Sequence, residues 1–357
     1  MGASFLKAPK KDKAVEVGGN DKLRYAVVAM QGWRAEMEDA HVARLAADGD
    51  EDGISLFGVF DGHCGAEVAQ YCAAHWVQAV EAAEGYPQDL YAALRRSFFI
   101  LDENLLDPAK SAEFLNGLEA RRRLEARKRN REDRDHLERE VRARMDDASS
   151  RGTLSSNEAL AIAEIMSELE KDQKAKNRRL TEAGCTAICA ALKGKTLIVA
   201  NAGDSRAVLC RKDGKALALS EDHKPNNLIE HDRISKAGGW VLDGRVNGQL
   251  ALSRAIGDFD FKKNQSMAPE KQAVTCDPDV SVTELTKDDE FLIIACDGIW
   301  DVVSNEEAVN FIREGLKAGE SVASVVTRLL DRCLAENTTG TMLGTDNMTC
   351  LVVVFRR

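Results

Sequence analysis

The chain has 357 residues, of which 44% are hydrophobic and 30% are charged, values that are typical of a soluble globular protein with a substantial core. The net charge of −10 argues against nucleic acid as the main partner, because phosphate binding needs a basic surface. The N-terminus lacks the apolar stretch of a signal peptide, and no apolar run has the length needed to span a bilayer.

Nine cysteines are scattered along the chain without a Cys-x-x-Cys pair. Several lie in apolar, strand-like runs, where a free thiol behaves as a small hydrophobic side chain. We interpret them as reduced core residues of an intracellular protein, and not as a disulfide framework or a zinc site. The expected location is cytoplasmic, with a nuclear or membrane-associated location left open.

Residues 1–20 are expected to form a flexible N-terminal segment ahead of a main domain that covers residues 21–357. Gly2 could carry a myristoyl group and so make a membrane contact, helped by the nearby lysines. Leu6 stands where that motif usually has Ser or Thr, however, and a disordered polar tail is the favoured interpretation.

Strands are predicted where β-branched and aromatic residues run together, and helices where apolar residues recur at helical spacing. The predicted strands cover residues 23–31, 54–60, three short runs within 184–210, 290–296 and 348–355. The predicted helices cover residues 65–84, 90–106, 305–316 and 320–335. Because strands meet at short turns in both halves of the chain and helix pairs interrupt them, this order predicts an α+β fold of antiparallel sheets covered by helices.

The segment from about 108 to 179 differs from the rest because charged residues of both signs dominate it. This mixture favours a solvent-exposed helix with i,i+4 ion pairs, or a partly disordered insertion. A basic arm for nucleic acid is disfavoured, because acidic residues are interleaved and the charge-rich run 121–147 has no aromatic residue. We expect a charged helical insertion that could bind a partner protein.

Polar residues stand where apolar runs end. The run 54–60 is followed by Asp61, Gly62 and His63, which places a carboxylate and an imidazole at the rim of the core. A second apolar run ends in the same way, with Asp297 followed by glycine. Each aspartate alone is more commonly a turn residue.

Two further loops with acidic residues accompany those of Asp61 and Asp297. Arg34 precedes Glu38 and Asp39 in one loop, and Asp346 stands just before the last predicted strand. Carboxylates that gather at strand ends are costly to bring together without a cation. Four such loops indicate one shared site for hard cations that prefer oxygen ligands.

The motifs occur in a definite order along the chain: RxxxEDxH, VFDGH, GCTA, NAGDSRAV, SEDHKP, RVNGQLALSRAIGD, ACDGIWD and GTDNMT. This ordered set resembles the metal-dependent protein serine/threonine phosphatases, the PPM or type 2C family. The resemblance covers nearly the whole chain except the charged insertion. It implies two central antiparallel β-sheets sandwiched by helices (α-β-β-α) and phosphoprotein substrates.

The resemblance also implies two Mn²⁺ or Mg²⁺ ions. Asp61 would bridge the ions, and Gly62 would contribute its backbone carbonyl. Asp39 would be a ligand or would support one. The full set of implied metal residues is Glu38, Asp39, Asp61, Gly62, Asp297, Asp301 and Asp346.

A third ion is doubtful. Many family members carry an aspartate at the position of Thr181, and a hydroxyl is a poor substitute for a carboxylate. Asp301, the other residue expected to hold this ion, is present. The two-metal centre does not depend on Thr181.

For catalysis, the resemblance implies that a metal-bridged hydroxide attacks phosphorus in line, without a covalent intermediate. Arg34 would grip the phosphate and His63 would protonate the leaving oxygen. Asp204 and Asp258 are assigned to structure. The alternatives are a catalytically weak or inactive pseudophosphatase that acts as a binding scaffold, and a different metal-dependent hydrolase. The stretch 226–262, called the flap below, corresponds to the family's flap beside the catalytic cleft.

Overall fold

The computed structural model describes residues 5–107, 109–110, 182–339 and 342–356. The chain divides into two units, and the description below concerns the unit formed by Met1–Leu106 and Thr181–Arg357. The insertion expected at about 108–179 lies almost entirely outside the described residues, as do Gly2 and Thr181. The expectations for lipidation and for the insertion therefore remain predictions.

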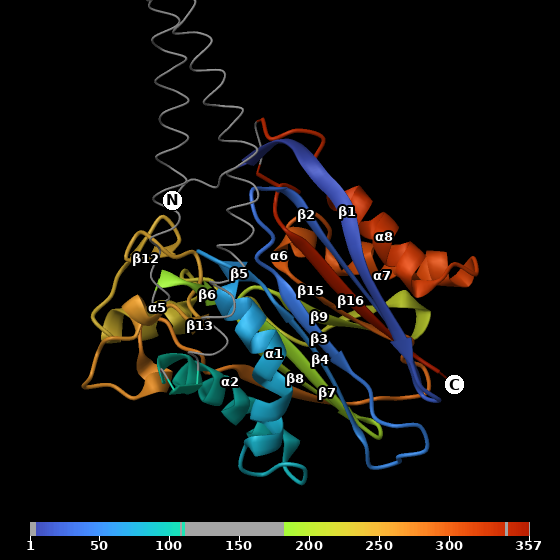
Figure 1. The fold of residues 1–357 in the computed structure, drawn as a ribbon, viewed down its shortest axis with the longest axis horizontal. Helices are drawn as coiled ribbons and strands as arrows, with labels where there is room; N and C mark the ends of the chain where they lie inside the picture. Colours follow the sequence, from blue (N-terminus) through green and yellow to red (C-terminus); the bar gives the residue numbers. More distant parts are fainter. Residues whose placement is uncertain (1–4, 108, 111–181, 340–341, 357) are drawn as a thin grey trace, which may run out of the picture. The chain divides into compact units, whose positions relative to one another are not determined.

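Two antiparallel sheets form the centre of this unit (Figure 1). The six-stranded sheet has the order β1-β2-β16-β15-β9-β10. Its strands are β1 (Phe5–Gly19), β2 (Leu23–Arg34), β9 (Arg206–Cys210), β10 (Ala216–Ala218), β15 (Phe291–Ala295) and β16 (Met348–Phe355). The five-stranded sheet has the order β14-β8-β7-β4-β3. Its strands are β3 (Ala40–Arg44), β4 (Ile54–Phe60), β7 (Ala187–Lys193), β8 (Thr196–Ala202) and β14 (Asp279–Glu284).

Helices cover the outer face of each sheet, which confirms the predicted α+β class. Helices α1 (Glu67–Ala82) and α2 (Leu90–Leu106) pack on the five-stranded sheet. Helices α7 (Asn305–Lys317) and α8 (Val322–Cys333) pack on the six-stranded sheet. Among the described residues, no helix combines the length and apolar character needed to cross a bilayer.

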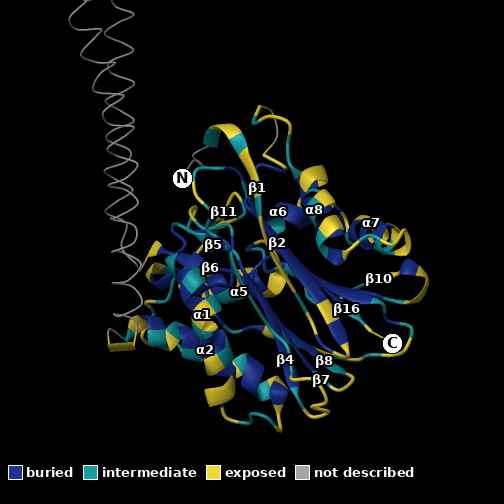
Figure 2. Ribbon diagram, turned by 45° about the vertical axis from the view of Figure 1, so that its right-hand side comes forward, coloured by how far each residue is buried: buried dark blue, intermediate teal, exposed yellow. Residues whose placement is uncertain are grey.

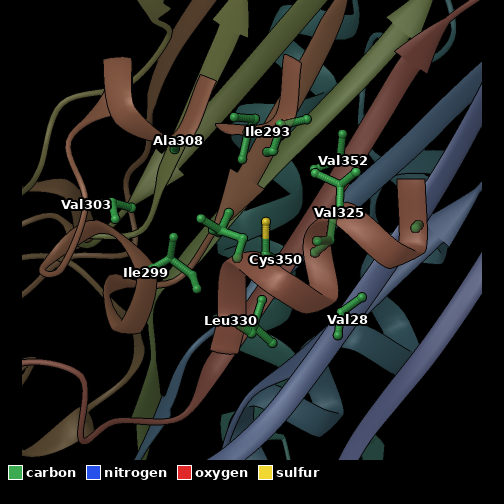
Figure 3. Close-up of a cluster of buried hydrophobic side chains, with 14 of the residues drawn as sticks. Val28, Ile293, Ile299, Val303, Ala308, Val325, Leu330, Cys350 and Val352 are labelled. Carbon is green, nitrogen blue, oxygen red and sulfur yellow. The ribbon is translucent and has the colours of Figure 1, made fainter. Parts of the chain in front are cut away.

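Strand β2 shows why the layers form in this order. Its side chains alternate between two cores, as the period of two in a strand requires. Val28 faces α8, whereas Tyr25 and Val27 face the five-stranded sheet. Figure 2 shows the central strands mostly buried, and Figure 3 shows Val28, Val352 and Val325 of α8 in one cluster of buried side chains. Burial on both faces therefore makes this strand rigid enough to fix the loops at its ends.

The expectation of a flexible segment over residues 1–20 is wrong for Phe5–Gly19. These residues form strand β1, which pairs with β2 and places Val15 opposite Val28. Most of its side chains are exposed, so apolar patterning gave no sign of a strand. Backbone hydrogen bonds to the edge of an existing sheet hold the segment, and these bonds do not depend on side-chain type.

Two small sheets and two short helices complete the fold. The small sheets have the orders β13-β6-β5 and β11-β12. Their strands are β5 (Gly62–His63), β6 (Gly184–Cys185), β11 (Val241–Leu242), β12 (Arg245–Val246) and β13 (Ile256–Gly257), and the short helices are α5 (Leu228–Lys236) and α6 (Asp297–Trp300). The predicted strand beginning at Gly184 is interrupted at Thr186, whose N–H donates to the carbonyl of Asp61 (2.9 Å).

A buried charge cluster anchors the flap to the body of the protein. Glu230 of α5 is only 2% exposed and accepts hydrogen bonds from Arg233 (2.7 Å), Ser253 (2.6 Å) and Arg254 (2.7 Å). Arg254 also donates to Asp279 of β14 (2.7 Å). Burial by itself would raise the pKa of Glu230, but the two arginines and Ser253 outweigh it and lower the pKa to about 2.

The lowered pKa of Glu230 predicts acid sensitivity. A carboxylate with a depressed pKa stabilises the fold above its ordinary value of 4.5, and this contribution is lost as the pH falls toward about 2. The contribution is at most about 3 kcal/mol at neutral pH. Urea unfolding between pH 6 and pH 2 should therefore show a shallower pH dependence in Glu230→Gln than in the unmodified protein. The exposed Asp232→Asn serves as control, and equal slopes in all three proteins would contradict the assignment.

Candidate metal centre

The polar loops meet because the register of the sheets brings them to one end. In the six-stranded sheet, Met348 lies opposite Met30, and Ala295 lies opposite Cys350. The end of β2, the start of β16 and the end of β15 therefore lie next to one another at the same end of the sheet. In the five-stranded sheet Phe60 lies opposite Ala40, so the loop from β2 to β3 passes beside Asp61. Sequence-distant carboxylates are gathered at this end of the paired sheets.

Two groups of potential ligands lie there. Carboxylate oxygens of Asp61, Asp204 and Asp297 all lie within 4.8 Å of one another. Oxygens of Asp39 and Asp61 lie within the same distance of each other and of Cys296 Sγ. Among the described residues, these are the groups close enough to hold an ion, and Asp61 belongs to both.

Burial and mutual repulsion make two of these carboxylates hard to ionise. Burial, followed by repulsion from Asp297, Asp39 and other aspartates, raises the pKa of Asp61 well above its ordinary value. The pKa of Asp297 is raised in the same way, by burial and then by Asp204 and Asp346. A divalent cation would remove this repulsion and keep the groups ionised.

Asp39 supplies a direct test of whether a cation fits. Burial raises the pKa of Asp39 to about 6, although the hydrogen bond that Oδ2 accepts from Thr349 Oγ1 (2.7 Å) acts to lower it. Its second oxygen, Oδ1, is buried and has no hydrogen-bond partner. A buried acceptor without a donor is costly, and a hard cation is a partner that satisfies it. The oxygen donors are those that Mg²⁺ and Mn²⁺ prefer, so the residues fit the expected ions.

The glycine after each central aspartate allows the loops to approach. A Cβ atom on Gly62 would overlap the carbonyl oxygen of Glu38, and one on Gly298 would overlap the carbonyl oxygen of Asn347. In each Asp-Gly pair, therefore, the aspartate stands next to a position that has no room for a side chain. The resemblance to the family implies that the carbonyl of Gly62 binds a metal, and this role stays a prediction. The structure shows that Gly62 must lack a side chain because it packs against the backbone of Glu38.

The other predicted metal residues surround the two groups. Asp346 contributes to the repulsion at Asp39, Asp61 and Asp297. Asp301 lies one helical turn after Asp297. Burial is the largest cause of its raised pKa, and the charge of Asp204 raises the pKa further. Glu38 lies outside both groups, and its charge acts on His63.

Arg34 borders the centre on the side of Asp346. Its Nη2 donates to Asp346 Oδ2, and its Nε is buried without a hydrogen-bond partner. An arginine beside clustered carboxylates offers donors to an anion that enters the site. The phosphate-binding role of Arg34 remains a prediction.

His63 forms a pair with Asp258. The His63 Nε2 and Asp258 Oδ2 atoms are 2.8 Å apart. Burial opposes protonation of the ring, but Asp258, and then Glu38 and Asp204, outweigh it and raise the pKa of His63. The raised pKa favours the protonated ring, and the contact with Asp258 engages Nε2 and not Nδ1.

The comparisons with known proteins agree with this geometry. The family profile described as Protein phosphatase 2C matches residues 23–120 and 122–342. A probable protein phosphatase 2C 11 of Oryza sativa subsp. japonica is 43% identical, over 99% of this chain and 91% of its own length. A probable protein phosphatase 2C 5 of Paramecium tetraurelia is 37% identical over 99% of both chains. The chain belongs to the protein phosphatase 2C family.

Membership makes the protein a serine/threonine phosphatase of a metal-dependent family. Among solved structures, a phosphatase from a pathogenic strain of Toxoplasma gondii shares the fold with a TM-score of 0.64 and 23% identity, over 97% of this chain and 96% of its own. A serine-threonine phosphatase 2C from Toxoplasma gondii gives a TM-score of 0.62 and 19% identity over 99% of both chains.

Sequence analysis missed two contributors to the site of this phosphatase. Asp204 and Asp258 were assigned to structure, but Asp204 belongs to an acidic group and Asp258 is the partner of His63. Asp204 also receives a charged hydrogen bond from Lys224 Nζ. Asp204 follows the end of strand β8, the same pattern that identified Asp61, and it could have been found on that ground.

Gly298→Ala tests the close approach of the loops in the phosphatase. The added Cβ must push the loop of Asn347 away from Asp297, so we expect Mn²⁺ to raise the Tm of this variant by less than it raises the Tm of the unmodified protein. Gly239→Ala in the flap is the control, because a Cβ there would meet no atom closer than 3.1 Å, the distance to Asn247 Oδ1 and Ile234 Cγ2, whereas at Gly298 it would overlap a backbone oxygen. An unchanged response to Mn²⁺ in Gly298→Ala would show that the approach is not needed for binding.

Proposed function

We propose that this phosphatase hydrolyses phosphoserine and phosphothreonine in proteins and uses two divalent ions, Mn²⁺ or Mg²⁺. The observation that carries the proposal is that Asp61 belongs to both acidic groups, which suits a residue shared between two ions. Asp297 belongs to one group and Asp39 to the other. When bound, such ions lower the pKa of water and neutralise charge on the phosphoryl oxygens.

The protein's own residues would bind the phosphate and transfer a proton. Arg34, with a donor nitrogen that lacks a partner, would hold the phosphoryl oxygens of the substrate. His63 would give its Nδ1 proton to the serine or threonine oxygen as the P–O bond breaks, while Asp258 keeps the ring oriented through Nε2. In-line attack by water then needs no covalent link to the enzyme.

A pseudophosphatase that serves as a scaffold is the disfavoured alternative. A protein that does not bind metal has no reason to hold Asp61, Asp204 and Asp297 together against their mutual repulsion. A third ion is proposed to be weak or absent because Thr181 lacks a carboxylate. That position lies outside the described residues.

Asp61→Asn tests the shared ligand. The substitution removes charge at nearly constant volume, so we expect a folded protein with hydrolysis of a phosphothreonine peptide reduced at least about 100-fold. Turnover is measured over separate Mn²⁺ and Mg²⁺ titrations. Asp331→Asn, which removes a half-exposed carboxylate paired with Lys13, should keep full turnover. Equal turnover in Asp61→Asn and the unmodified protein would rule out the shared-ligand mechanism.

Arg34→Ala tests the phosphate contact. Loss of a charge-assisted donor to the bound substrate should raise KM about tenfold or more, and kcat should fall by less. Arg332→Ala is a suitable comparison, because Arg332 lies 3.8 Å from Glu307 in an exposed ion pair. A fall in kcat at constant KM would show that Arg34 acts on the transition state alone.

A further inference from the structure

The loop between β2 and β3 carries two predicted metal residues but lacks regular secondary structure. It spans residues 35–39 and includes Glu38 and Asp39. Its backbone N–H and C=O groups have no helix or sheet partners, so other groups must satisfy them where water is excluded. Whatever satisfies them also fixes where the two carboxylates lie.

The side chain of Asn347 makes two of these hydrogen bonds, to Glu36 and Glu38, and a third to Gln31 of strand β2. Its Nδ2 donates to the carbonyl of Gln31 (2.8 Å) and to the carbonyl of Glu36 (3.0 Å). Its Oδ1 accepts from the N–H of Glu38 (2.8 Å). Asn347 is only 4% exposed, so water does not compete for these groups. Both donor hydrogens of the amide and its acceptor are used, an arrangement that fixes the loop in one geometry.

The backbone of Asn347 is fixed by its own loop and by the loop of Asp297. Its N–H donates to the Oδ1 of Asp346 (2.7 Å), the preceding residue. Its carbonyl oxygen accepts a weak hydrogen bond from Cys296 Sγ (3.5 Å) and lies against Gly298. Asn347 therefore stands where the loops of Glu38, Asp297 and Asp346 meet.

A second amide holds the part of the chain next to the phosphate-binding residue. Gln31 Nε2 donates to the carbonyl of Arg34 (2.9 Å) and to the carbonyl of Ala35 (2.8 Å). Since Asn347 holds the backbone carbonyl of Gln31, the two amides act on one continuous stretch of chain. Displacement of Asn347 would therefore be passed on to Arg34 as well as to Glu38.

We propose that Asn347 is the positioning residue of the metal centre. Its side-chain amide holds the loop of Glu38 and Asp39 at the distance from Asp297 and Asp346 that a bound ion requires. The inference rests on the proposed function, because it concerns the same ions. Partners that orient metal ligands typically contribute 10- to 100-fold to metal affinity.

Gln272 provides a closely matched control. This residue is 6% exposed, and its Nε2 donates to the carbonyls of Asn264 (2.8 Å) and Met267 (3.0 Å). Its Oε1 accepts from the N–H of Asn264 (3.0 Å). Gln272 thus makes the same three kinds of bond as Asn347, but it does so next to the flap and away from the carboxylates.

The experiment is calorimetric titration of Mn²⁺ into the unmodified full chain, Asn347→Ala and Gln272→Ala, with urea unfolding of each. Both variants should lose stability, because both leave buried backbone groups without partners. Only Asn347→Ala should bind Mn²⁺ at least about tenfold more weakly. Its KM for a phosphothreonine peptide at saturating Mn²⁺ should also rise, because the loop leading from Arg34 loosens.

The outcomes separate the inference from the proposed function. Equal Mn²⁺ affinity in folded Asn347→Ala and the unmodified protein would overturn the positioning role, as would an equal loss in Gln272→Ala. Failure of the unmodified protein to bind Mn²⁺ would overturn the proposed function and the positioning role together.

Amide hydrogen exchange on the unmodified protein is a second measurement that does not depend on a variant that folds. The Glu38 N–H is bonded to a buried amide oxygen, so it should exchange as slowly as the amides of strand β2. Exchange of the Glu38 amide at the rate of an exposed loop would overturn the positioning role. Slow exchange that persists in folded Asn347→Ala would do the same.

Discussion

Mutual repulsion among buried carboxylates is the constraint on which the rest of this phosphatase depends. Asp61, Asp204 and Asp297 are held within a few ångströms of one another at the end of two tightly packed sheets. Asp61 and Asp297 are harder to ionise there than in water, because burial and neighbouring charges both raise their pKa. The folding of the sheets supplies the free energy that holds this cluster together, and a cation that binds there recovers part of it.

The apolar layers make the cluster possible because they define where the strands stop. Strands with both faces buried leave little freedom at their ends, so the loops start from fixed points. The loops themselves have no regular structure, and they keep their positions through glycines that permit backbone contact and through side-chain amides. Gly62, Gly298 and Asn347 belong to this supporting layer, in which a small error of position would reach the metal ligands directly.

The two residues proposed to act on the substrate, His63 and Arg34, lie beside the acidic cluster and are influenced by its charge. Asp258 and the wider negative field raise the pKa of His63, and Arg34 donates a hydrogen bond to Asp346. A phosphate entering the site would compete with Asp346 for the arginine, while a bound ion would compete with the arginine for the same carboxylate. On the proposed function, substrate binding and metal binding would therefore be coupled through this one ion pair.

The sequence by itself determined the secondary structure of the core and the family. Periodicity of two and of 3.6 is a local property, so most of the buried strands and the longer helices were predicted within a residue or two. Strand β2 continues three residues beyond its predicted end, to Arg34, and the less buried strands β3 and β14 were not predicted. Asp61 and Asp297 were found because each directly follows an apolar run. Only the tertiary structure decided that residues 5–19 form a strand, because pairing with β2 and not side-chain pattern holds it.

Contacts between residues far apart along the chain could not be predicted from the sequence either. Asp258 stands 195 residues after His63, and Asn347 stands 309 residues after Glu38. No local pattern connects such positions. Only the packing of the two sheets brings them within hydrogen-bond distance, and for that reason the partners of the catalytic residues appear only in the fold.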